Sequence, residues 1–175
     1  MKIIIASDIH GSLTAAKALL AAAEREGAEQ IALLGDIYYH GPRNPLPDRY
    51  DPKGVAALLN GRNDLIVVKG NCDSEVDGMI SSFRFAEDAY LFVGKKIFLT
   101  HGHVYNIDNL PAGCDAVFYG HVHYGFICEK DGIVVANPGS VSLPKNNSEK
   151  SYLLLDGTVL YLKNLEGKIL EKRGL

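Results

Sequence analysis

Three apolar runs in the first half of the chain end in short polar stretches, and this pattern limits the fold more than any other feature of the sequence. The runs cover residues 2–6, 30–34 and 64–68. Continuous apolar runs of this length are typical of strands buried on both faces, as in the parallel sheets of α/β proteins. The carboxyl ends of parallel strands lie at one edge of the sheet, where such proteins bind their ligands. We therefore expect the polar side chains that follow these runs to meet at one site.

The rest of the pattern predicts an α/β first half and a mainly β second half. Alanine and leucine recur at helical spacing over 13–26, between an N-cap at Ser12 and a terminating Gly27, and a short helix begins at Pro52. Short strands follow at residues 90–93, 96–100, 116–119, 126–130, 133–136, 152–155 and 159–162, with an edge strand at 168–171. Because 175 residues without a linker fit one domain, we expect a single domain, residues 1–175. Its expected architecture is α/β, a four-layer α/β/β/α sandwich of two mixed sheets.

Residues with metal-binding side chains follow most of the predicted strands. Asp8 and His10 follow the first strand, and because alternate residues of an extended segment point the same way, they can reach one ion. The others are Asp36, Asn71, His101, His103, His121 and His123. Two divalent cations ~3.5–4 Å apart need six or seven N and O donors with a bridging carboxylate, and this set supplies them. Such donors favour Mn, Fe, Co, Ni or Zn over Ca or Mg. The alternative for any one of these residues is an ordinary polar side chain without a metal.

The charge balance and the cysteines argue against several classes of protein. Eighteen Lys and Arg against 21 Asp and Glu give a net charge of −3, which provides no general attraction for nucleic acid or an acidic membrane. The cysteines, Cys72, Cys114 and Cys128, form no C-x-x-C pair, so neither a disulfide framework nor a zinc ribbon is predicted. No apolar stretch approaches the ~18 residues that span a bilayer. We expect a cytoplasmic protein that does not bind a membrane. Nucleic acid is disfavoured as a binding partner.

The order of these motifs resembles that of the calcineurin-like metallophosphoesterases over nearly the full chain. The shared order is Asp-x-His, Gly-Asp, Gly-Asn-x-Asp, His and Gly-His-x-His. Three longer stretches, residues 40–44, 70–77 and 137–142, are similar to the bacterial YfcE group of phosphodiesterases. The resemblance implies the metallophosphoesterase fold and a phosphoric ester hydrolase of the phosphodiesterase class.

The resemblance also implies which residues hold two divalent cations. Asp8, His10 and His123 bind one ion, Asn71, His101 and His121 bind the other, and Asp36 bridges them. Manganese is the expected metal, with Fe, Zn, Co and Ni as alternatives. A water between the ions is acidified to hydroxide and attacks phosphorus in line, which gives Asp36, Asn71 and His101 catalytic roles as well. Asp73 is expected to orient Asn71 or a histidine, and the backbone of residues 137–139 to shape the pocket.

One position departs from the superfamily pattern. Much of the superfamily has a His after the motif Asn that is thought to protonate the leaving group, and here that residue is Cys72. A thiol, with a reference pKa of about 8.5, is a poorer general acid near neutrality, which favours aryl leaving groups. The alternative is that Cys72 only fills space, as free cysteines commonly do.

Three more residues are candidates for contact with substrate. Arg43 can fork onto a phosphate oxygen, and His40 or His103 can supply a hydrogen-bond donor or a proton. The competing interpretation is that the proline-rich loop at 38–52 is a lid or an interface in which Arg43 is solvated.

Three functions fit these residues. The first is a phosphodiesterase, the second a phosphomonoesterase or nucleotidase, and the third a non-catalytic scaffold of the same fold, which the complete ligand set disfavours. The expected substrate is a small phosphodiester or nucleotide-like molecule, whose identity these motifs do not define. Exposed edge strands near the C-terminus allow a homo-oligomer.

Overall fold

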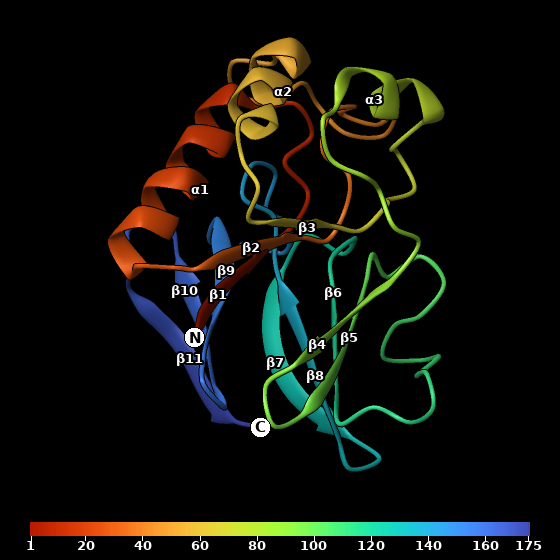
Figure 1. The fold of residues 1–175 in the computed structure, drawn as a ribbon, viewed down its shortest axis with the longest axis vertical. Coiled ribbons are helices and arrows are strands. Elements are labelled where there is room, and N and C mark those ends of the chain that lie inside the picture. The colour runs from red at the N-terminus through yellow and green to blue at the C-terminus, as the bar shows by residue number, and fades with distance from the viewer.

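Two mixed β-sheets form the centre of the computed structural model, which describes residues 1–175 (Figure 1). The six-stranded sheet has the order β11 (Ile169–Gly174), β10 (Val159–Asn164), β9 (Ser151–Asp156), β1 (Lys2–Ala6), β2 (Gln30–Leu33) and β3 (Leu65–Val67). The five-stranded sheet has the order β4 (Ala89–Phe92), β5 (Lys96–Thr100), β6 (Ala116–Tyr119), β8 (Ile133–Pro138) and β7 (Gly125–Lys130). The predicted α/β fold class with two mixed sheets is confirmed.

Strand β1 shows why the first apolar runs contain no polar alternation. It pairs in parallel with β2 and antiparallel with β9. Ile3 and Ile5 belong to the core between the two sheets, whereas Ile4 and Ala6 belong to the core beneath the helices. All four side chains are fully buried, so each of these four positions requires an apolar residue.

Helices α1 (Leu13–Glu26) and α2 (Pro52–Asn60) cover the outer face of the six-stranded sheet (Figure 1). The Ser12 side chain accepts a hydrogen bond from the backbone N of Ala15 and caps α1. Gly27 ends the helix at φ 65°, a left-handed conformation that glycine adopts without strain. Both helix starts were predicted from the sequence and are confirmed.

Helix α3 (Glu75–Ile80) was not predicted. None of its residues is buried, so it has no apolar stripe with a helical period. The available signal was the capping box that joins Ser74 to Asp77 at its start.

The outer face of the five-stranded sheet carries a coil segment where we expected a helical layer. Residues 101–115 run along this face, and Tyr105, Ile107 and Leu110 pack against its apolar residues (Figure 1). Asn106 and Asn109 hydrogen-bond backbone carbonyls within the segment, which stabilises turns instead of a helix. The fourth layer is therefore irregular, although the two sheets are as predicted.

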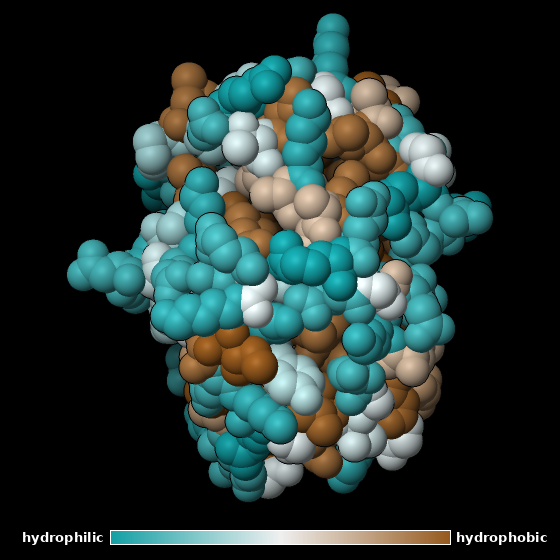
Figure 2. Space-filling view, turned by 90° about the vertical axis from the view of Figure 1, so that its left-hand side faces the viewer, coloured by the Kyte–Doolittle hydropathy of each residue, from teal (hydrophilic) through white to brown (hydrophobic).

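On the side of the molecule where α1 lies, hydrophilic side chains separate the apolar ones into small groups (Figure 2). No helix of the structure is both long enough and apolar enough to cross a membrane.

Candidate metal centre

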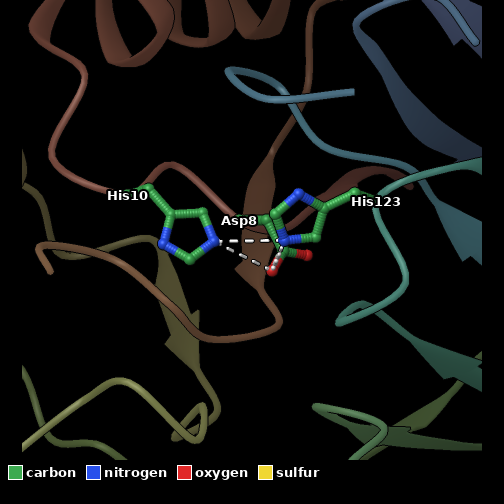
Figure 3. Close-up of side chains that lie close together, drawn as sticks. All are labelled: Asp8, His10 and His123. Carbon is green, nitrogen blue, oxygen red and sulfur yellow. Dashed lines mark hydrogen bonds and ion pairs between the residues drawn. The ribbon is translucent and has the colours of Figure 1, made fainter. Parts of the chain in front are cut away.

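Polar side chains from the ends of several strands converge at one edge of the two sheets. Asp8 and His10 follow β1, and Asp36 follows β2; the residues after β5 and β6 include His101 and His123. Potential ligand atoms lie within 4.8 Å of one another in three groups: Asp8–His10–His123, Asp8–Asp36–His101 and His10–Asp36–Cys72. The first group is drawn in Figure 3, where the rings of His10 and His123 and the carboxylate of Asp8 point toward one another, although His123 is distant from the other two in the chain.

The backbone that brings these side chains together is left-handed rather than extended. Positive φ angles occur at Asp8 (57°), His10 (50°), Asp36 (56°), His121 (69°) and His123 (64°). We expected Asp8 and His10 to converge because alternate residues of an extended segment share a face, and this reasoning was wrong. The chain instead turns sharply at each of these residues, which aims neighbouring side chains inward. Non-glycine residues in this conformation each cost about 1–2 kcal/mol, a strain that is common at functional sites.

Hydrogen bonds fix which nitrogen of each imidazole faces the centre of the first group. His10 Nδ1 lies 2.7 Å from the carbonyl oxygen of Tyr39, and His123 Nδ1 lies 2.7 Å from that of Leu143. A carbonyl oxygen only accepts, so each Nδ1 carries the proton and each neutral ring presents an Nε2 lone pair to the centre. The two Nε2 atoms are 3.2 Å apart.

A carboxylate oxygen completes this cluster of acceptors. Asp8 Oδ1 is buried without a hydrogen-bond partner and lies 3.2 Å from His123 Nε2 and 3.5 Å from His10 Nε2. Three acceptors can face one another at these distances only with a cation or a proton among them. The chemistry of this donor set fits a metal ion.

His101, Asn71 and Asp36 form a second acceptor cluster beside the first. His101 Nδ1 donates to the carbonyl oxygen of Leu34 at 2.6 Å, which leaves Nε2 facing Asn71 Oδ1 at 3.0 Å and Asp36 Oδ2 at 3.5 Å. Asp36 Oδ2 also lies 3.7 Å from His10 Nε2, in the first cluster. The carboxylate of Asp36 thus lies between the two clusters, where a group shared by two cations would have to be. The arrangement is consistent with a dinuclear metal site.

His121 lies beside the second cluster and is partly exposed, whereas His10, His101 and His123 are buried. Its ring centroid is 5.1 Å from that of His101, and its backbone N donates to Asp8 Oδ2 at 3.0 Å. It belongs to none of the three groups of closely spaced ligand atoms. Burial and the neighbouring His101 charge lower the pKa of His121, which keeps its ring neutral.

In the metal-free protein, the carboxylates of Asp8 and Asp36 raise the pKa of His10 and of His101 and so favour positive charge on these two rings. Burial opposes ionisation of Asp8, yet contacts with His10 and His123 hold its pKa well below the usual range. Burial likewise opposes charge on His101, but the hydrogen bond to Asp36 and the charge of Asp8 raise its pKa to about 9. In the absence of metal, a proton therefore occupies this cluster at neutral pH.

Metal binding is expected to release protons for this reason. At pH 7 the metal-free His101 is protonated, and a cation binds only the neutral ring, so binding should expel at least one proton and tighten as pH rises toward about 9. Titration calorimetry of the metal-free protein with Mn²⁺, in two buffers of different ionisation enthalpy, measures the protons released. Equal heats in the two buffers at pH 7 would contradict this expectation.

We had expected Asp73 to orient Asn71 or a histidine, but its carboxylate instead hydrogen-bonds backbone groups. Its Oδ2 accepts hydrogen bonds from the backbone N of Asp36 and of Gly70, both at 2.7 Å. Its Oδ1 accepts a third, from the backbone N of Ile37 at 2.8 Å. The buried carboxylate therefore ties the loop after β2 to the loop after β3.

The stretch at 137–142 supports the site through side chains rather than through its backbone alone. The Ser140 and Ser142 hydroxyls donate to the carbonyl oxygen of Asp8 at 2.8 and 2.9 Å, and Asn137 Nδ2 donates to that of Gly120 at 2.7 Å. These contacts hold the left-handed turn at Asp8 and the start of the His121 loop. We had not assigned roles to the two serines, although they lie in a motif that carried the family resemblance.

A cavity of roughly 690 Å³ opens over the second cluster and the end of the first. Its wall includes Asp36, Asn71, Cys72, His121 and His123, together with the loop at 41–44 and Lys145. The cavity therefore gives a ligand direct access to several of the candidate metal-binding side chains.

Of the three candidate substrate-binding residues, Arg43 lines this cavity, whereas His40 and His103 lie outside it. The His40 ring packs edge-on against Tyr39 and Tyr50. His103 is exposed, with its ring 5.5 Å from that of His101.

Together, a two-sheet α/β fold and buried Asp and His clusters at strand ends define a metallophosphoesterase. Residues 1–158 match the calcineurin-like phosphoesterase superfamily domain, and the chain belongs to this family.

Individual relatives agree with this assignment. Over 165 residues the chain is 44% identical to phosphodiesterase YfcE of Escherichia coli K12, covering 91% of this chain and 90% of that protein. It is 30% identical to the probable metallophosphoesterase YsnB of Bacillus subtilis 168, covering 89% and 83% of the two chains. The solved structure of the phosphoesterase YfcE from E. coli superposes with a TM-score of 0.96 at 40% identity, over 99% of both chains. Vps29 of Cryptosporidium parvum shares the fold, with a TM-score of 0.64 at 20% identity over 99% and 98% of the chains.

Proposed function

We propose that this protein is a phosphodiesterase with two divalent cations, of which Mn²⁺ is the first choice. The observation that carries the proposal is the convergence of imidazole lone pairs and carboxylate oxygens at a cavity, with their Nδ1 protons held by carbonyl groups. The 44% sequence identity to phosphodiesterase YfcE, over 91% of this chain, supports the same reaction. The ligands we assign are Asp8, His10 and His123 for one cation, Asn71, His101 and His121 for the other, and Asp36 for both.

The chain's own residues would bind and orient while the cations supply the reactive chemistry. Two bound divalent cations would provide Lewis acidity toward phosphoryl oxygens and a nucleophile derived from water. The carbonyl partners of His10, His101 and His123 fix the imidazole orientations before any substrate binds. Asn71, an exposed residue on the cavity wall, places its amide where the phosphoryl group enters.

A comparison of two aryl substrates tests the proposal. Purified protein loaded with Mn²⁺ should hydrolyse bis(4-nitrophenyl) phosphate with a higher kcat/KM than 4-nitrophenyl phosphate. The reverse preference would indicate a phosphomonoesterase or nucleotidase. Absence of hydrolysis of both esters with Mn²⁺, Fe²⁺, Co²⁺, Ni²⁺ and Zn²⁺ would leave only the scaffold function.

Cys72 is expected to be a weak proton donor. Its backbone N donates to Asp36 Oδ1 at 2.8 Å, and burial together with the Asp36 charge raises the pKa of its thiol to about 12. General acid catalysis typically contributes at least about 100-fold to a rate. Because an introduced histidine recovers only part of this effect, Cys72→His should raise kcat for alkyl diesters relative to aryl diesters by at least about tenfold. Cys72→Ala, which removes the thiol without adding an acid, is the control. An unchanged alkyl-to-aryl ratio in Cys72→His would reject a proton-donor role at this position.

Several finer assignments stay predictions. They are the substrate contacts of His40 and His103, the single domain over residues 1–175, the cytoplasmic location and the homo-oligomer. The three cysteines are unpaired, which supports a reducing compartment.

A further inference from the structure

The cavity at the metal centre carries two cationic side chains, Arg43 and Lys145. They are the cations among its twelve lining residues, and neither forms an ion pair within the chain. Neither is a metal ligand, since cations do not coordinate metals. Both side chains are exposed, so their charges are available to an anionic ligand in the cavity.

Both side chains project from loops that are anchored at the metal centre. The turn at 41–44 is closed by a hydrogen bond from Asn44 N to the carbonyl oxygen of Gly41 at 3.3 Å, and it approaches the thiol of Cys72 so closely that a Cβ on Gly41 would lie 3.1 Å from Cys72 Sγ. The turn that carries Arg43 thus passes close to Cys72, and Arg43 lines the cavity.

The backbone of Lys145 is tied to that of His123. Its backbone N donates to the carbonyl oxygen of His123 at 3.0 Å, and its own carbonyl oxygen accepts from the Ser148 hydroxyl at 2.7 Å and from the Ser148 backbone N at 3.0 Å. The two cations therefore line the same cavity from two loops, one packed near Cys72 and the other hydrogen-bonded to His123.

The charge at this site exceeds what a simple phosphodiester can neutralise. With two divalent cations bound, the carboxylates of Asp8 and Asp36 and a hydroxide nucleophile would offset three of the four metal charges, and Arg43 and Lys145 add two positive charges to the remaining one. A phosphodiester carries one negative charge. A terminal phosphate carries about −1.5 to −2 at pH 7 and several acceptor oxygens, which suits an Arg fork and a Lys ammonium group.

The size of the cavity agrees with a larger substrate. A volume of roughly 690 Å³ lies within the range of about 300–1,000 Å³ of sites that enclose whole small molecules. Tyr39, which is 43% exposed, together with Pro42 and Val122 gives the wall an apolar surface for the organic part of a ligand.

We propose that the substrate is a phosphodiester with an additional terminal phosphate group, and that Arg43 and Lys145 bind this second phosphate. The proposal rests on the proposed phosphodiesterase function and specifies its substrate class.

Two matched nucleotides test this inference. Thymidine 5′-(4-nitrophenyl phosphate) contains one diester, and its 3′-phosphate derivative adds one terminal phosphate. The Mn²⁺-loaded protein should hydrolyse the 3′-phosphorylated compound with at least a tenfold higher kcat/KM. Arg43→Ala and Lys145→Ala should each reduce this ratio at least threefold, whereas Lys150→Ala, an exposed residue outside the cavity, should leave it unchanged.

Binding measurements separate this inference from the function on which it rests. By calorimetry, thymidine 3′,5′-bisphosphate should bind at least tenfold more tightly than thymidine 5′-phosphate, and each cavity variant should lose part of that difference. Equal kcat/KM for the two diesters would overturn the inference while leaving the phosphodiesterase intact. If neither diester is hydrolysed, the proposed function fails, and equal binding of the two nucleotides would then overturn the inference as well.

Discussion

Replacing Asp36 with Asn is expected to lower kcat for a phosphodiester by more than about 100-fold. Loss of a residue that only orients a metal ligand typically costs 10–100-fold in activity or metal affinity, and Asp36 lies between both clusters. The Asn side chain keeps the shape and one acceptor oxygen but lacks the negative charge that reduces repulsion between two cations. Metal analysis of the purified variant should show fewer than two ions per chain.

Asp131→Asn is the matched control for this substitution. Asp131 lies in the exposed turn between β7 and β8 with φ 54°, a conformation that Asn adopts readily. It should retain wild-type activity and metal content. An Asp36→Asn enzyme with two bound ions and normal kcat would refute the bridging role.

Gly70→Ala is expected to disrupt both stability and activity. A Cβ at this position would lie 2.1 Å from Asp36 Oδ1 and 2.3 Å from Asp36 N, closer than nonbonded atoms approach. The loop after β3 would have to move away from the loop after β2, which would break the hydrogen bonds that Asp36 N and Ile37 N donate to Asp73. Overpacking of this kind costs about 1–3 kcal/mol in the free energy of unfolding, measured by urea denaturation. Because Asp36 is displaced, we expect kcat to fall by at least about tenfold.

Gly78→Ala controls for the loss of a glycine. A Cβ at Gly78, in α3, would have no neighbour within 4 Å, and alanine favours the helix, so the variant should be unchanged or slightly more stable. Wild-type activity in Gly70→Ala would show that the close approach of the two loops is unnecessary.

The sequence predicted most of the fold because burial on both faces of β1 and β2 leaves a strong apolar signal. The ends of these strands were equally clear, since polar residues replace the apolar ones where the chain leaves the core. Helix α3 lacks any buried residue and so gave no periodic pattern. The coil at 101–115 depends on side-chain to backbone hydrogen bonds, which composition alone does not define.

The sequence predicted which residues form the site, but it did not predict the backbone conformation that brings them together. The structure brings Asp8, His10, Asp36, His101 and His123 together, although by left-handed turns that no strand pattern predicts. The partners of Asp73 are backbone groups on a neighbouring loop, and only the paired arrangement of β2 and β3 brings them within reach.

The left-handed residues of the metal centre also indicate how this domain would change if selection for catalysis were relaxed. The backbone of five residues at this site has a positive φ angle, which glycine and, to a lesser degree, asparagine tolerate better than histidine does. Replacing His121 or His123 by glycine would remove local strain while the two sheets, whose cores lie elsewhere, stayed intact. At these positions a substitution that stabilises the fold would remove a side chain needed for catalysis. Mutations accumulated without selection for activity would therefore inactivate the site while the domain stayed folded.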